Sequence, residues 1–133
     1  MEDRGVEPIK RFVRVEEVPL KMNADISGNP RDQGCWKSLI ARETGSKDLS
    51  LGMGWMKPGE IHPLHHHVKA SEFYYVLEGS ATMTVAGEEF KATPGTAVYI
   101  PAGDTHRIVN DGEGELVVLF GYNRPEWENI WDE

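Results

Sequence analysis

The chain has 133 residues, 39% of them hydrophobic, and a formal net charge of −8 at pH 7. This length predicts one domain that buries about two-thirds of its unfolded surface. The negative charge argues against general binding to nucleic acid or to an anionic membrane, and the single cysteine, Cys35, excludes an intramolecular disulfide. The N-terminus lacks an apolar signal segment and no apolar run is long enough to span a bilayer, so we expect a soluble cytoplasmic protein.

The first part of the chain predicts one strand and one long connection. Residues 9–15 alternate apolar and basic side chains, which indicates an edge strand. Residues 23–33 are polar and contain glycine and proline, which is typical of an irregular connection. Long loops often carry function, so this connection either covers the mouth of a barrel or runs over the surface.

Two strands are predicted next, at residues 36–41 and 49–56, joined by a polar turn. Alternation along the second strand places Leu51, Met53 and Trp55 on one face. We expect this bulky set to face the interior, where it fills the core or lines a pocket.

The remaining chain reads as short segments rich in strand-forming residues, separated by turn residues. The predicted strands are residues 73–77, 81–85, 88–91, 96–100, 105–109 and 116–121. Many short strands with almost no helix predict an all-β sandwich or barrel. We predict a single domain over residues 1–133, with an ordered core from about residue 9 to residue 122. In the tail, residues 123–133, Trp127, Ile130 and Trp131 have helical spacing, and we expect them to pack on the barrel wall or on a partner subunit.

Histidines gather in one short segment of the chain. Four of the five lie within residues 62–67, and such crowding of titratable groups favours metal binding. Side chains alternate across a strand, so His65 and His67 point to one face while His66 points to the other. Glu72 follows after an odd number of positions, so a bend or bulge in residues 68–71 must redirect the chain before Glu72 can join that face.

A further imidazole, His106, has to come from a different strand, because side chains on one ribbon cannot surround an ion. Three imidazoles and a carboxylate suit a divalent transition metal such as Fe, Mn, Ni, Co, Cu or Zn. We therefore predict one divalent transition metal per chain. Four ligands leave two positions of an octahedral metal for substrate, water or O2.

The spacing of these residues resembles the two sequence motifs of the cupin superfamily, G-x5-H-x-H-x4-E-x6-G and G-x5-P-x-G-x2-H-x3-N. Every position matches, from Gly59 to Gly79 and from Gly95 to Asn110. The resemblance implies a jelly-roll β-barrel and a metal bound by His65, His67, Glu72 and His106. It also implies a homodimer, because small cupins commonly pair through sheet faces or exchange N-terminal strands.

Tyr74 is the candidate catalytic residue. It lies two positions after Glu72 on one strand and should therefore face the metal. A phenol beside a divalent cation can serve as a general acid or base. The layout from Leu49 to the tail is similar to that of single-cupin dimethylsulfoniopropionate lyases, and this resemblance implies that Tyr74 acts as a base.

Two classes of function remain open. The first is a metalloenzyme with lyase, isomerase or dioxygenase chemistry on a small oxygenated or anionic molecule. The second is a non-catalytic, metal-dependent domain that binds or senses a small molecule.

Four polar residues near the ligands have weaker assignments. His62 either forms hydrogen bonds behind the metal ligands or is solvated, and we expect the latter. We expect His66 to be structural, Asn110 to shape a turn and Arg107 to point outward.

Overall fold

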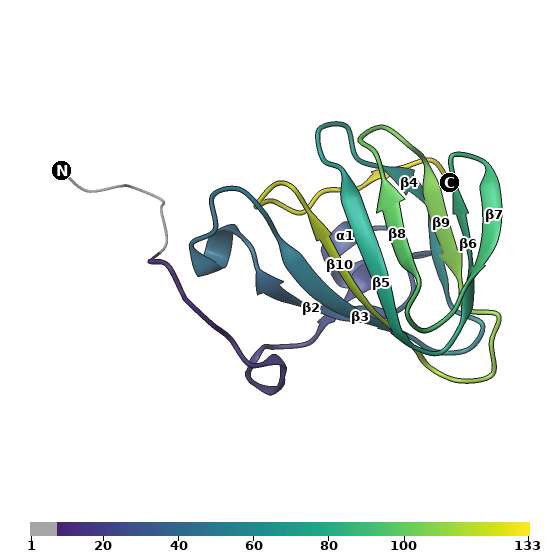
Figure 1. Cartoon of the computed structure of the whole chain (residues 1–133), viewed down its shortest axis with the longest axis horizontal. Coiled ribbons are helices and arrows are strands. Elements are labelled where there is room, and N and C mark those ends of the chain that lie inside the picture. The colour runs from purple at the N-terminus through teal and green to yellow at the C-terminus, as the bar shows by residue number, and fades with distance from the viewer. Residues whose placement is uncertain (1–7) are drawn as a thin grey trace.

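The computed structural model describes residues 8–133, so the first seven residues of the predicted domain lie outside the described residues. Within this range two antiparallel sheets pack face to face, as Figure 1 shows. One sheet has the spatial order β1 (Lys21–Met22), β2 (Cys35–Ile40), β3 (Leu51–Met56), β10 (Leu116–Tyr122), β5 (Glu72–Glu78) and β8 (Ala97–Ile100). The other has the order β11 (Ile130–Trp131), β4 (Ile61–His66), β9 (His106–Val109), β6 (Ala81–Val85) and β7 (Glu88–Ala92). The predicted all-β jelly-roll barrel is confirmed.

Alternation along the strands separates the core from the surface. In β5, Glu72, Tyr74 and Val76 are buried, whereas Phe73 and Tyr75 are exposed. The inward-facing side chains of both sheets form one hydrophobic core. This core holds β5 in a fixed rotation, and that rotation points Glu72 and Tyr74 into the barrel.

The bend predicted in residues 68–71 is present between β4 and β5. These two strands belong to different sheets. The bend therefore carries the chain from one sheet to the other, and this crossing lets Glu72 face the same interior as His65 and His67.

The prediction for β3 was wrong about which face fills the core, although Trp55 of the bulky set does line the cavity described below. Gly52, Gly54 and Met56 are buried, whereas the bulky residues that alternate with them are only half-buried. Phe120 of the neighbouring β10 pairs with Gly52, and a Cβ atom at Gly52 would lie 2.6 Å from its ring. Glycine is needed on the inner face because it leaves room for this aromatic ring.

Residues 9–14 do not form the predicted edge strand; they run outside the two sheets, and a short 3-10 helix follows at Val15–Glu17. The connection predicted at residues 23–33 contains a five-residue helix, α1 (Asn23–Ser27). In the tail, residues 130–131 form β11 rather than a helical turn, because they pair with β4 at its histidine end. No helix among residues 8–133 has the length and apolar character needed to cross a membrane.

Candidate metal centre

Three strands bring the four predicted metal ligands together. His65 is the penultimate residue of β4, His67 directly follows that strand, Glu72 begins β5, and His106 begins β9. β4 and β9 are paired in a register that places His65 opposite His106. All four side chains are no more than 3% exposed, and one ligand atom from each lies within 4.8 Å of all the others. This separation is close to twice a metal–ligand distance of about 2.1 Å.

The outer nitrogens of two of the three imidazoles are held by backbone carbonyl groups. His65 Nδ1 lies 2.8 Å from the carbonyl oxygen of Pro63, and His106 Nδ1 lies 3.0 Å from that of Asp104. A carbonyl oxygen only accepts, so both Nδ1 atoms carry the proton. In a neutral ring the inner nitrogen, Nε2, then carries a lone pair directed at the centre of the group. This is the arrangement by which metal-binding histidines are oriented.

Lone pairs face one another at the centre of this group. Glu72 Oε1 lies 2.9 Å from Nε2 of His67 and 2.9 Å from Nε2 of His106. His65 Nε2 is buried and has no hydrogen-bond partner among residues 8–133. A carboxylate oxygen and lone-pair nitrogens at this separation require a positive charge between them, either protons or a metal ion. The residues present therefore fit a divalent cation.

The electrostatics agree with this conclusion. Burial, together with the neighbouring rings of His62 and His106, lowers the pKa of His65 well below its usual value, so its ring is neutral. Burial alone would raise the pKa of Glu72, but where protons lie between it and the Nε2 atoms of His106 and His67, the resulting hydrogen bonds outweigh burial and lower that pKa to about 2. A neutral imidazole and an ionised carboxylate are the forms that bind metal.

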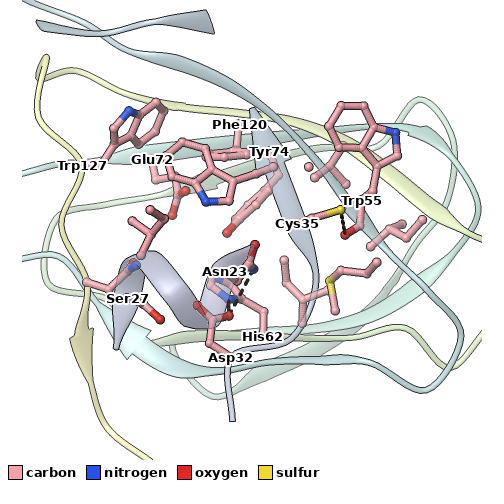
Figure 2. Close-up of a pocket in the computed structure, with 18 of the residues that line it drawn as sticks. Asn23, Ser27, Asp32, Cys35, Trp55, His62, Glu72, Tyr74, Phe120 and Trp127 are labelled. Carbon is pink, nitrogen blue, oxygen red and sulfur yellow. Dashed lines mark hydrogen bonds and ion pairs between the residues drawn. The ribbon is translucent and has the colours of Figure 1, made fainter. Parts of the chain in front are cut away.

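A cavity of about 350 Å³ lies between the sheets and reaches Glu72 (Figure 2). Tyr74 is 4% exposed and lines this cavity, and its ring centroid is 6.4 Å from that of His106. Burial, and then the charge of Glu72, raise the pKa of Tyr74 well above its usual value. Tyr74 thus has the inward position that strand alternation predicted.

Comparison with known proteins agrees with this architecture. Residues 54–122 match the family described as the cupin domain. The chain belongs to the cupin family. Over 120 residues it is 33% identical to dimethylsulfoniopropionate lyase DddW of Ruegeria pomeroyi, a match that covers 89% of this chain and 75% of that protein.

Two further proteins that are similar to this cupin carry names from polyketide chemistry. Polyketide synthase CurC of Streptomyces cyaneus is 31% identical over 97 residues, and the match covers 72% of this chain but only 63% of CurC. The solved structure of polyketide cyclase RemF from Streptomyces resistomycificus has a TM-score of 0.76 at 23% identity, with 94% of this chain and 87% of that chain covered. The likeness to RemF supports the fold alone.

His62 is not solvated, contrary to the prediction. Its ring centroid lies 4.4 Å from that of His65, and its Nδ1 lies 2.7 Å from Asp32 Oδ1. The pairing of β4 with β9 is irregular between His62 and His65. This irregularity brings to the same side two residues that regular alternation would have placed on opposite faces.

The other assignments agree with the structure. His66 points away from the ligands and contacts Asp132, and Arg107 pairs with Glu133 on the outside. Asn110 shapes the turn that follows β9 by accepting a hydrogen bond from the backbone N–H of Gly112.

The sequence predicted that the tail packs on the barrel wall or on a partner subunit, but not that it covers the histidine end of this cupin. The Tyr122 hydroxyl lies 3.3 Å from His67 Nδ1 and donates to the carbonyl oxygen of Glu128. Trp131 packs on His65 with a centroid separation of 5.2 Å. The aromatic character of the tail was visible in the sequence, but its pairing with β4 was not.

Proposed function

We propose that this cupin is a metal-dependent lyase or isomerase that acts, without O2, on a small oxygenated or anionic molecule. The observation that carries the proposal is the position of Tyr74, buried in the cavity beside the four-residue group. The similarity to the lyase DddW over 89% of the chain supports the same class of reaction. Dioxygenase chemistry is the alternative for the same ligand set, and it is an outcome of the test below.

His65, His67, Glu72 and His106 would hold the metal. When bound, a divalent ion there supplies a Lewis acid that polarises an oxygen of the substrate and favours loss of a neighbouring proton. Three neutral imidazoles and one carboxylate leave such a site with a net positive charge. That charge suits an anionic or oxygen-bearing group of the substrate, since no lysine or arginine among residues 8–133 lines the cavity.

Tyr74 moves the proton in this scheme. As a phenolate it takes a proton from the carbon next to the polarised group, and the C–H electron pair forms a C=C bond. In a lyase the leaving group departs from the next carbon with its bonding pair; in an isomerase Tyr74 returns the proton to another carbon. Burial disfavours the phenolate, so this role depends on positive charge beside Tyr74.

The test follows reactions by NMR in D2O without O2, using metal-loaded protein and 3-substituted propionates that carry a dimethylsulfonio, hydroxy or amino group. Elimination gives an alkene, and reversible proton abstraction gives deuterium next to the carboxylate, so either chemistry is visible. Tyr74→Phe should lower the rate by about 10²–10⁴-fold, the usual value of a positioned acid–base group. Tyr75→Phe is the matched control, because Tyr75 neighbours Tyr74 but faces outward and is 41% exposed.

Two results would contradict the proposal. Turnover that requires O2 would favour a dioxygenase, and equal rates for the Tyr74 and Tyr75 variants would remove Tyr74 from the chemistry. Metal content measured on the same samples separates loss of the base from loss of the ion.

A further inference from the structure

A small polar cluster outside the four metal-binding residues also lines the cavity. It consists of Asn23 at the start of α1, Asp32 and His62, which Figure 2 shows joined by hydrogen bonds. Asp32 Oδ1 accepts a hydrogen bond from Asn23 Nδ2 at 3.2 Å and lies 2.7 Å from His62 Nδ1. Asp32 is only 3% exposed, so this is a buried charge tied to two neighbours.

Asn23 presents an acceptor that nothing in the protein uses. Its Nδ2 donates to Asp32 Oδ1 and to the carbonyl oxygen of Gln33, at 3.1 Å for the latter. Both of those atoms only accept, so the orientation of the amide is fixed and its other atom is the carbonyl oxygen. This Oδ1 is buried and has no hydrogen-bond partner among residues 8–133. Buried acceptors without a partner are costly and rare in folded proteins.

The rest of the cluster also offers acceptors. Asp32 adds its carboxyl oxygens, one of which lies 2.7 Å from His62 Nδ1. The cavity lining contains no lysine or arginine among the described residues. The cavity therefore has two unlike polar groups, which adjoin where His62 packs on His65. The metal-binding group suits an oxygen anion, and the cluster suits a donor.

We propose that the Asn23–Asp32–His62 cluster is a specificity site for a second polar group of the substrate, and that this group is a hydroxyl or amine that donates to Asn23 Oδ1. The inference rests on the proposed function, in which an oxygen-bearing group of the substrate lies at the metal site. A dimethylsulfonio group has no N–H or O–H. A substrate selected by this cluster therefore differs from dimethylsulfoniopropionate.

The test measures binding by calorimetry to protein loaded with Co²⁺. The probes are three ω-hydroxycarboxylates, 3-hydroxypropionate, 4-hydroxybutyrate and 5-hydroxypentanoate. Each is compared with butyrate, pentanoate or hexanoate, in which a methyl group replaces the hydroxyl. At the chain length that reaches both groups, the hydroxyl compound should bind about 10-fold more tightly, because the methyl group leaves Asn23 Oδ1 unpaired.

Variants then locate this preference. Asn23→Leu, similar in size but without the amide, should abolish the preference for the hydroxyl compound. Asn129→Leu is the matched control, because Asn129 also lines the cavity but is exposed on the tail, and it should keep the preference. If Asn23→Leu does not fold, the comparison of hydroxyl and methyl compounds on the wild-type protein still tests the donor site.

The outcomes separate this inference from the proposed function. If the carboxylates bind but the methyl compounds bind as well as the hydroxyl compounds at every length, the donor site is wrong and the proposed function stands. A preference that survives in Asn23→Leu would also overturn it. If no carboxylate binds to the loaded protein, both proposals fail.

Discussion

The two polar groups of the cavity are built in different ways, although His62 of one packs on His65 of the other. The metal-binding group takes all its residues from β4, β5 and β9 or from the residue next to them, where strand pairing fixes the direction of each side chain. The cluster takes Asn23 and Asp32 from α1 and the loop after it, and only His62 from a strand. The proposed reactive centre therefore belongs to the barrel, whereas the proposed choice of ligand belongs mainly to segments outside it. Loops of this kind can change without loss of the fold.

The first and largest effect is expected in the strand-built barrel. Asn110 follows β9 at the end away from His106 and is fully buried, and its Nδ2 donates to the carbonyl oxygens of Met56 at 2.8 Å and Gly114 at 3.1 Å. Asn110→Ala removes these bonds and the bond from Gly112, so the free energy of unfolding should fall by about 3 kcal/mol. Denaturant unfolding measures this change. A change under about 0.5 kcal/mol, the range expected for the exposed control Asn129→Ala, would contradict the view that buried bonds of this kind hold the barrel.

A smaller effect is expected from Trp127, a residue of the tail that forms part of the cavity wall. Trp127 lines the cavity, donates from Nε1 to Ser38 Oγ at 3.0 Å, and packs on Trp36 with a centroid separation of 5.2 Å. Trp127→Ala should weaken binding of the best hydroxycarboxylate by about 10-fold through loss of aromatic contact, and Trp127→Phe should recover part of it. Metal content should not change in either variant. Loss of metal from Trp127→Ala would show that metal binding depends on this wall of the cavity, and would contradict the separation of the two regions.

The smallest effect on the site is expected from the outer face of the six-stranded sheet. Tyr99 of β8 is 71% exposed and pairs in register with Phe73, which is 41% exposed. We propose that this apolar face forms the homodimer. Tyr99→Lys should convert the dimer to a monomer in light scattering without changing metal content, whereas Glu89→Lys, exposed on the other sheet, should remain dimeric. A wild-type mass of one chain across micromolar concentrations would exclude the dimer.

The contrast between strand-built and loop-built parts also explains which features could be predicted from the sequence. The metal-binding group was predictable because alternation in β4 and β5 sets which side chains share a face, and spacing alone requires the bend between them. The inward face of β3 could not be predicted, because it depends on Phe120. This residue is distant in sequence, and its ring needs the space above Gly52. His62 was assigned to solvent because nothing local signals the irregularity before His65.

The flanking segments escaped prediction for a related reason. The cluster and the contacts of the tail depend on residues that are 30 or more positions apart. Examples are the pairs Asp32 with His62 and Trp131 with His65. Residues 9–15 show the converse, since an alternating pattern does not make a strand where no neighbouring strand pairs with it.

The most direct test of the account is the metal content of the purified protein and its variants. Elemental analysis should find close to one equivalent of a divalent transition metal per chain, and His106→Ala should lose most of it. His66→Ala is the matched control and should retain the metal, because His66 points outward to Asp132. The identity of the metal also bears on the reaction, since a redox-inactive ion would favour the lyase or isomerase. Absence of metal from the wild-type protein, with no uptake on incubation with Fe, Mn, Ni or Zn, would contradict the central claim.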